Sequence, residues 1–403
     1  GPQIRVKRGE RVKVRLINEL SEPTSIHWHG IRIDNAMDGV SGLTQDAVLP
    51  GQSFDYDFVV PDVGTYWYHA HTKTWNQVAR GLYGVLIVED DEEVFDVDHD
   101  IVLVLDDWRL GQDGKLDILS LGSTVDWSHE GRLGNWLTIN GRPPHEYEIN
   151  AGEPYRLRLI NASNARSFEI DPNSFGAKII AFDGQATPQA QTLAYSPMLL
   201  GPAQRVDLLV KPQPGKNFSI NEMSNGQNYP LVNFRVLGEK EPEAKDIRII
   251  PNPLPEPDIE NALTFKLHMT GGAMGRIEDM VFNGEQLEGE DFVNFKQFWA
   301  FNGIANLSEE PFFRVERNQS VIIEVFNDTS FLHAMHAHGH HFRVIERVGV
   351  DIDEGMPWRD TFMIGARQTT RIAFVADNPG KWLFHCHMLE HAAAGMITWF
   401  DVA

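Results

Sequence analysis

The stretch H-C-H-M-L-E-H-A-A-A-G-M, residues 385–396, contains the one cysteine of this 403-residue chain. Histidines stand on both sides of Cys386, a third follows at His391, and Met396 closes the stretch. Two imidazoles, a thiolate and a weak axial thioether are the ligands of a blue-copper electron-transfer site. The stretch therefore predicts such a site, and the histidines beside Cys386 predict a second metal centre joined directly to the first.

Histidines elsewhere in the chain are grouped in pairs. Composition alone gives roughly 0.6 pairs of the form H-x-H for a chain with 16 histidines. Alternate residues of a β-strand point to one face, so each pair can present two imidazoles in one direction. One such pair is more often an ordinary core or surface feature than a ligand pair, whereas several separated pairs indicate a metal cluster. The five pairs are His27/His29, His69/His71, His336/His338, His338/His340 and His385/His387.

The composition is that of a globular protein, with 42% hydrophobic and 23% charged residues and enough length for two to four domains. The net charge of −22 argues against nucleic acid or an anionic membrane as a partner. This charge modestly favours cationic or neutral substrates, although solubility alone also explains it. No apolar run is as long as a membrane span, and a single cysteine excludes an internal disulfide.

A threefold repeat organises the chain. Residues 4–18, 147–161 and 313–327 each alternate apolar and polar positions around a turn and end on an asparagine. This alternation predicts paired β-strands that are half-buried in a sandwich. Nine residues after the asparagine, the first and third copies carry an H-x-H pair, whereas the second copy carries none.

A glycine further along each copy shows the same difference between the second copy and the other two. Gly64 and Gly380 are each followed at five and seven residues by histidines, whereas the matching Gly215 is followed by Ile220 and Glu222. We therefore expect metal ligands in the first and third of three domains, with the second acting as a spacer and part of a substrate surface. The expected domains are 1–90, 91–240 and 260–403, with a Glu- and Pro-rich linker at 241–259 and short helical segments in connections such as 72–82.

The two metal centres are expected in different places. The cysteine and methionine occur only in the third copy, since Val85 stands in the first copy where Met396 stands in the third. One mononuclear site is therefore expected in the third domain. The four separated H-x-H pairs divide evenly between the first and third domains, which predicts that they face each other in a multinuclear site at the interface.

These residues resemble the multicopper oxidases, in particular the three-domain bacterial laccases and copper-efflux oxidases. Four family motifs occur in order: H-W-H-G at 27–30, H-A-H at 69–71, H-A-M-H-A-H-G-H at 333–340, and the stretch 385–396. The resemblance covers nearly the whole chain and implies an all-β fold of three cupredoxin-like Greek-key β-sandwich domains. It also implies a periplasmic or secreted protein. The chain opens inside a predicted strand, so we expect a further N-terminal segment before Gly1, which is where a targeting signal would lie.

The resemblance further implies four copper ions: one of type 1, one of type 2 and two of type 3. His340 matches a family position that is not a ligand. His341, His99, His129, His145 and His268 receive no role. The implied ligands are His333, Cys386, His391 and axial Met396 for type 1, His27 and His336 for type 2, and His29, His69, His71, His338, His385 and His387 for type 3.

The implied activity couples four one-electron oxidations to the reduction of O2 to water. Electrons taken from substrate at the type 1 copper pass through the Cys386 sulfur and the adjoining backbone to His385 and His387. A thiolate suits this path because it binds copper covalently, and it must be deprotonated to do so. The axial methionine implies a potential toward the low end of the family range, since this ligand tunes it.

Protons must also reach the cluster. Asp38, in the sequence M-D-G, matches a family acid near the cluster and is assigned proton delivery; the alternative is a turn-forming aspartate before Gly39. Copper-efflux relatives often have a glutamate directly after the second type 1 histidine, where this chain has Ala392. Glu390 or a chain of water molecules would then have to replace that relay.

Phenols or aromatic amines are the leading substrate class. Copper-efflux relatives carry a methionine-rich insert that binds Cu(I), and here only Met269, Met274 and Met280 cluster loosely. Core packing explains such methionines equally well, so oxidation of Cu(I) or Fe(II) is the second interpretation. A non-enzymatic cupredoxin, either an electron carrier or a scaffold, is a third, but it would not need all twelve ligands. The substrate pocket is expected over His391 or His333, with residues 354–361 as one rim.

Overall fold

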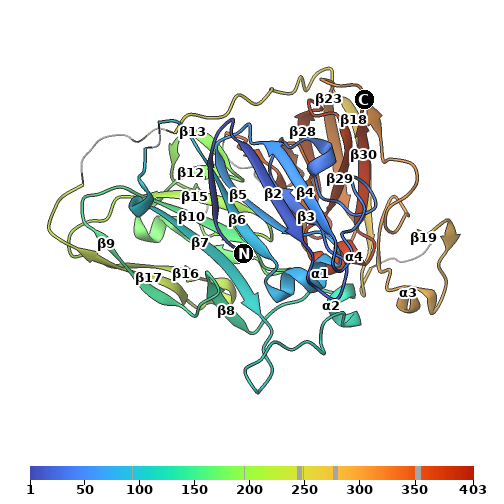
Figure 1. Ribbon diagram of the computed structural model, residues 1–403, viewed down its shortest axis with the longest axis horizontal. Helices are drawn as coiled ribbons and strands as arrows, with labels where there is room; N and C mark the ends of the chain where they lie inside the picture. The colour runs from blue at the N-terminus through green and yellow to red at the C-terminus, as the bar shows by residue number, and fades with distance from the viewer. Residues whose placement is uncertain (93, 195, 243–246, 248, 276–279, 350–354) are drawn as a thin grey trace.

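The computed structural model describes every residue except 93, 195, 243–246, 248, 276–279 and 350–354. Strands dominate these residues, and no α-helix among them exceeds five residues. None of these helices is long and apolar enough to cross a lipid bilayer. Figure 1 shows three groups of strands that follow one another in chain order: blue, green and orange to red.

The first group is a small sandwich of two sheets. Trp28, Tyr56 and Phe58 are buried between them, as the alternation of apolar residues requires. The helix α1 (Thr74–Gln77) lies in the connection at 72–82, where the sequence predicts one. One sheet has the order β1 (Ile4–Lys7), β6 (Tyr83–Glu89), β5 (Gly64–Ala70) and β3 (Ile26–His29), and the other pairs β2 (Arg11–Ile17) with β4 (Ser53–Val59).

The middle group has its own hydrophobic core, which includes Leu157, Phe168, Leu208 and Phe234. Its sheets contain six, three and two strands. The strand order of the six-stranded sheet is β13 (Gln185–Gln191), β12 (Lys178–Phe182), β15 (Arg205–Val210), β10 (Tyr155–Asn161), β7 (Asp100–Trp108) and β8 (Trp136–Ile139). The three-stranded sheet has the order β16 (Phe218–Glu222), β17 (Tyr229–Leu237) and β9 (His145–Asn150). The two-stranded sheet pairs β11 (Phe168–Ile170) with β14 (Met198–Leu200). The helix α2 (Thr124–Ser128) lies between β7 and β8.

The third group shares one continuous core with the first. The yellow segment that crosses the top of Figure 1 leads to it from β17. Its six-stranded sheet has the order β21 (Trp299–Phe301), β18 (Leu263–Gly271), β23 (Ser320–Asn327), β28 (Thr369–Val375), β25 (Phe342–Arg347) and β26 (Trp358–Arg359). Its five-stranded sheet has the order β22 (Arg314–Val315), β30 (Ile397–Val402), β29 (Gly380–Cys386), β24 (His333–Ala337) and β27 (Thr361–Ile364). Smaller elements are β19 (Val281–Phe282) with β20 (Glu285–Gln286), α3 (Asp291–Asn294) and α4 (Leu389–Ala393).

The fold is all-β and of the cupredoxin type, which confirms the predicted class. One detail of the prediction is wrong: the two strands of each repeat do not pair with each other. They lie in different sheets, and the first strand pairs in parallel with the last strand of its group. These pairs are β1 with β6, β9 with β17 and β22 with β30. Period-2 alternation identifies the buried face of a strand but not its partner.

The asparagine that ends each repeat has the same role in all three groups. Asn18, Asn161 and Asn327 are fully buried. Each Oδ1 accepts from the main-chain N–H two residues later, at 2.9 to 3.0 Å. Each Nδ2 donates to a carbonyl four or five residues later and to a distant carbonyl. These bonds fix the bends that lead into β3, β11 and β24, so each of these strands leaves its bend in a set direction. Of the three strands, β3 and β24 carry histidines and β11 carries none.

Candidate metal centres

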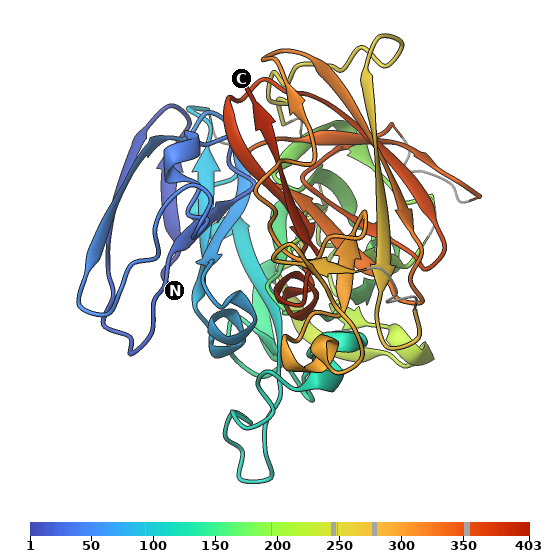
Figure 2. The ribbon, with the colours of Figure 1, turned by 90° about the vertical axis from the view of Figure 1, so that its right-hand side faces the viewer.

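Eight histidines from the first and third groups meet between these groups. Each group contributes two neighbouring antiparallel strands, and in each pair two histidines stand directly opposite: His27 and His69 on β3 and β5, and His336 and His385 on β24 and β29. The four partners spaced two residues further along point to the same face. Figure 2 shows the blue and red strands side by side.

The imidazoles of the two groups contact each other directly. The rings of His27 and His338 stack with centroids 3.8 Å apart, and those of His29 and His336 stack at 3.7 Å. The ligand atoms form three triplets, and within each triplet all atoms lie within 4.8 Å of one another. These triplets are His27, His29 and His336; His29, His69 and His387; and His71, His338 and His385.

Hydrogen bonds on the outer side fix the tautomer of most of these rings. The Nδ1–H of His336 donates to the Asp360 carbonyl at 2.8 Å, and that of His385 donates to the Cys386 carbonyl at 2.8 Å. Because carbonyl oxygens only accept, the proton must sit on Nδ1 and the lone pair on Nε2 faces the cluster. The other such bonds are from His27 to the Asp38 carbonyl, His69 to the Ala70 carbonyl and His338 to the Asp38 carboxylate.

This arrangement leaves lone pairs facing each other. The Nε2 atoms of His338 and His385 are 3.1 Å apart, although both rings carry their proton on the other nitrogen. Burial and the neighbouring imidazoles lower the pKa of His338 well below its usual value, and burial lowers the pKa of His385 to about 4. Neutral rings with converging lone pairs repel each other unless a cation lies between them, so the residues fit metal ions.

The second centre lies beside Cys386 at the end of β29. Its Sγ is 3.6 Å from the Nδ1 of His333 and 3.8 Å from the Nδ1 of His391, and these two nitrogens are 3.0 Å apart. The Nε2–H of His391 donates to the His129 carbonyl at 2.7 Å, which leaves the lone pair on Nδ1. Thr329 has the same effect on His333, because its hydroxyl donates to Asn327 and accepts from His333 Nε2.

The short helix α4 brings the remaining residues of the stretch to this centre. The Cys386 N–H donates to the Met396 carbonyl and the Met396 N–H donates to the His391 carbonyl, both at 3.0 Å. Met396 is fully buried. Burial raises the pKa of the Cys386 thiol to about 12, so only a metal cation with high affinity for thiolate would displace the proton. A thiolate with two imidazoles fits copper in particular.

Comparison with known proteins assigns the family. Sequence models of the multicopper oxidase family match residues 1–93, 99–237 and 283–403. The chain belongs to the multicopper oxidases. Oxidoreductase activity with copper cofactors therefore applies to it, and O2 and a reductant are the family's substrates.

Individual relatives span the whole chain of this multicopper oxidase. The chain is 31% identical to the multicopper oxidase MmcO of Mycobacterium tuberculosis, over 100% of this chain and 81% of the relative. It is 28% identical to the iron transport multicopper oxidase fetC of Epichloe festucae, over 99% and 71%. Among solved structures, a multicopper oxidase from Pseudomonas thermotolerans has a TM-score of 0.85 at 30% identity, and Lac15 from a marine microbial metagenome has 0.76 at 36%. Each alignment covers 100% of this chain and 92% of the solved chain.

Asp38 is part of the outer shell of the histidine cluster. It is fully buried, its Oδ2 accepts from His338 Nδ1 at 2.9 Å, and its Oδ1 is 3.2 Å from His27 Nδ1. The following Gly39 has φ +83° and lies against the Ile26 carbonyl. Asp38 therefore touches two cluster histidines and is also held by a tight turn.

Glu390 lies on the side of the cysteine centre that faces the middle group. It is buried, and its carboxylate accepts from Asn164 Nδ2 at 2.7 Å and from the Arg132 main-chain N–H at 3.2 Å. Burial raises the pKa of Glu390 to about 7. Among the described residues, the Glu390 carboxylate hydrogen-bonds to the middle group and not to the eight-histidine cluster.

Three groups that contact the candidate ligands could not be identified from the sequence. They are the Thr329 hydroxyl, the His129 carbonyl and Asp360. Asp360 falls within 354–361, which we expected at the rim of a substrate pocket; residue 354 lies outside the described part. The structure instead places Asp360 beside His29, with Oδ1 3.3 Å from Nε2. A main-chain carbonyl or a lone aspartate has no spacing pattern that could reveal it.

The three loosely clustered methionines do not form a group at the surface. Met269 and Met280 are 0% and 1% exposed and belong to the hydrophobic core, whereas Met274 is 65% exposed. The core-packing interpretation therefore holds for two of the three.

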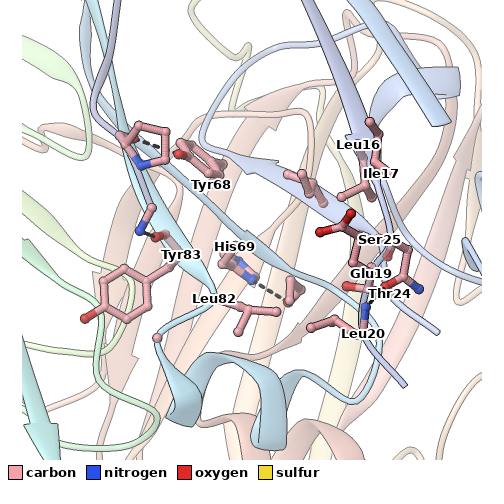
Figure 3. Close-up of a pocket in the computed structure, with 16 residues that line it drawn as sticks. Leu16, Ile17, Glu19, Leu20, Thr24, Ser25, Tyr68, His69, Leu82 and Tyr83 are labelled. Atoms are coloured by element: carbon pink, nitrogen blue, oxygen red, sulfur yellow. Dashed lines mark hydrogen bonds between the residues drawn. The ribbon is translucent and has the colours of Figure 1, made fainter. Parts of the chain in front are cut away.

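A cavity of about 390 Å³ opens in the first group (Figure 3). Leu16, Leu20, Tyr68 and Leu82 are among the apolar side chains around it, and His69 of the cluster also contributes to its lining.

Proposed function

We propose that the chain is a laccase-type oxidase with four copper ions, which oxidises phenols or aromatic amines and reduces O2 to water. The supporting observation is that nitrogen lone pairs converge at two places, one lined by eight histidines and the other by Cys386, His333 and His391. The two places are joined because His385 and His387 of the first adjoin Cys386 of the second in the sequence. When bound, the coppers would supply one-electron transfer at one centre and O2 reduction at the other. The proposed ligands are His333, Cys386, His391 and Met396 for type 1, His27 and His336 for type 2, and His29, His69, His71, His338, His385 and His387 for type 3.

The chain itself contributes orientation and a short path. His385 and His387 are the sequence neighbours of Cys386, so only peptide bonds separate the two centres. Asp38 orients His338 through Nδ1 and, in this proposal, also delivers protons to the cluster. Seven of the eight histidines are buried and His71 is partly exposed, so bulk water has limited access to the site.

The surroundings of His391 favour an organic substrate. Its outward nitrogen donates to the His129 carbonyl, the Trp299 ring packs at 4.4 Å, and Phe331 is 6.0 Å from the His129 ring. Among the described residues no carboxylate hydrogen-bonds to His333 or His391. Trp299, Phe331 and His391 are buried, so the substrate would approach over a neutral, partly aromatic layer that offers little to a metal cation.

Oxidation of Cu(I) or Fe(II) remains the second candidate, because the chain is 28% identical to an iron transport oxidase. The buried positions of Met269 and Met280 weigh against a Cu(I) site built from the methionine cluster. We also propose a periplasmic or secreted location, on the basis of the family alone.

Turnover of 2,6-dimethoxyphenol, Cu(I) and Fe(II), each with and without added Cu(II), tests the substrate class. The proposal expects efficient phenol oxidation that does not depend on added Cu(II). Strong activation of phenol oxidation by Cu(II), together with faster oxidation of Cu(I) or Fe(II), would replace it with the metal-oxidase alternative.

A further inference from the structure

Arg205, the first residue of β15 in the middle group, reaches the histidine cluster through a buried ion pair. Its Nη1 lies 2.8 Å from Asp360 Oδ1 and its Nη2 lies 2.7 Å from Asp360 Oδ2. Both side chains are 0% exposed. A bidentate pair of this kind fixes the plane of the carboxylate, and neither charge can turn toward water.

Asp360 in turn contacts two cluster histidines. Its Oδ1 is 3.3 Å from the Nε2 of His29, and its main-chain carbonyl accepts from the Nδ1–H of His336 at 2.8 Å. A carboxylate beside Nε2 keeps the proton there, so the lone pair on Nδ1 of His29 faces inward. That Nδ1 is buried and has no hydrogen-bond partner in the structure, which agrees with a ligand atom.

The glycine of the H-W-H-G motif makes room for the ion pair. A Cβ on Gly30 would lie 2.4 Å from Arg205 Nη2 and 2.6 Å from Asp360 Oδ2, and its φ of +85° also favours glycine. The guanidinium is held from behind by the Thr65 carbonyl, which accepts from Nε at 3.1 Å. Residues from all three groups thus fix one geometry.

We propose that Arg205 is a positioning residue for the multinuclear copper site: it holds Asp360 so that His29 and His336 present the correct nitrogen atoms. The middle group, which supplies no candidate ligand, therefore takes part in building the O2 site and is more than a spacer. This inference rests on the proposed copper assignment.

Arg158 provides a matched control. It is 1% exposed, is paired with Asp100 at 2.7 Å, and also bonds to Thr65 at 2.6 Å. Among the described residues, Arg158 donates no hydrogen bond to a candidate ligand or to Asp360, and it is linked to Arg205 only through Thr65, whose hydroxyl bonds to Arg158 and whose carbonyl bonds to Arg205. A variant at Arg158 therefore removes a buried arginine–aspartate ion pair within the middle group without touching the cluster.

The experiment compares copper-loaded Arg205→Met, Arg205→Lys and Arg158→Met with the parent chain. We measure copper per chain, type 1 absorption, the electron paramagnetic resonance spectrum of type 2 copper, and O2 uptake per type 1 site. Arg205→Met should retain type 1 absorption, show an altered type 2 spectrum and lose roughly 10- to 100-fold in copper affinity or O2 uptake. Arg205→Lys, which keeps the charge but not the two-pronged contact, should fall between Arg205→Met and the parent.

Arg158→Met should keep the parent type 2 spectrum even if it unfolds at a lower temperature. The inference is overturned if folded Arg205→Met matches the parent in spectrum, copper content and O2 uptake, or if Arg158→Met changes the spectrum equally. If Arg205→Met does not fold, Arg205→Lys decides: a parent-like spectrum and O2 uptake overturn the inference. Failure of the parent itself to bind a copper cluster would instead contradict the proposed function.

Discussion

At the scale of single residues, Cys386 connects the two centres. Its side chain lies between His333 and His391, while its main chain continues on either side into His385 and His387. The carbonyl of Cys386 also accepts from His385 Nδ1–H. One residue therefore binds the first centre, orients a ligand of the second and forms the covalent connection between them.

Replacing Cys386 with serine should remove the type 1 copper alone. A hydroxyl has far lower affinity for copper than a thiolate, so blue absorption should disappear and copper content should fall by about one ion per chain. Absorption spectroscopy and metal analysis of Cys386→Ser measure both. Met335→Leu is the matched control, because Met335 is buried directly opposite Cys386 on β24 and a volume-conserving change there should leave the spectrum intact. Retention of blue absorption by Cys386→Ser would contradict the assignment.

Asp183 makes the stability of the metal-free protein depend on pH. Burial and the neighbouring Asp360 raise its pKa to about 6, above its usual value near 4. Between these values the unfolded chain releases a proton that the folded chain retains, so stability falls as pH rises, by at most about 1.4 kcal/mol per pH unit. Above about pH 6 this loss is complete.

Asp183→Asn should remove this contribution, so the decrease in unfolding free energy between about pH 4 and 6 should be smaller than in the parent. Asparagine also tolerates the φ of +46° at this position. Denaturant unfolding of the metal-free proteins across this range measures the difference. Parallel pH profiles of parent and variant would show that Asp183 does not titrate there.

At the scale of elements, the turn after Asp38 determines where β3 places its histidines. A Cβ on Gly39 would lie 1.8 Å from the Ile26 carbonyl, which belongs to β3, and φ there is +83°. Gly42 has the same φ of +83°, but a Cβ there would meet nothing within 4 Å. The two glycines therefore separate the effect of the clash from that of backbone conformation.

Gly42→Ala should cost about 1 to 2 kcal/mol of unfolding free energy, the penalty of the left-handed conformation alone. Gly39→Ala should cost clearly more, because the strand must move away from the new methyl group. Denaturant unfolding of both metal-free variants measures the costs, and copper content shows whether the displacement reaches His27. Equal losses of stability would mean that the turn adjusts without moving β3.

Also at this scale, some elements could be predicted from the sequence and others could not. The histidine-bearing strands β3, β5, β24 and β29 could be located because residue type and a spacing of two together indicate ligands on one face. The pairing of β1 with β6 could not, since alternation carries no information on partners. The contact of Arg205 with Asp360 spans 155 residues and has no periodicity, so nothing in the sequence connects the two.

At the scale of the whole molecule, the eight histidines come from opposite ends of the chain. Bound copper ions would therefore cross-link the first and third groups in the folded state only. A ligand that binds only the folded state stabilises it, by about 4 kcal/mol at a concentration 1,000 times its dissociation constant. Copper removal should accordingly lower the unfolding temperature.

Thermal unfolding with copper and after chelation tests this stabilisation, with two variants for comparison. His69→Gln should lose much of the copper-dependent increase in unfolding temperature, because His69 lies in the cluster. His268→Gln should retain it, because His268 lies apart from the cluster and pairs with Asp328. Equal loss in both variants would mean that copper acts at sites other than those described.

The most direct test of the central claim combines metal analysis with the stoichiometry of O2 uptake in the purified, copper-loaded protein. Two joined centres with twelve ligands predict about four copper ions per chain and one O2 consumed for every four electrons taken from substrate, with no accumulation of hydrogen peroxide. A protein that holds a single copper ion and leaves dissolved O2 unchanged, or one that releases one peroxide per O2, would contradict it.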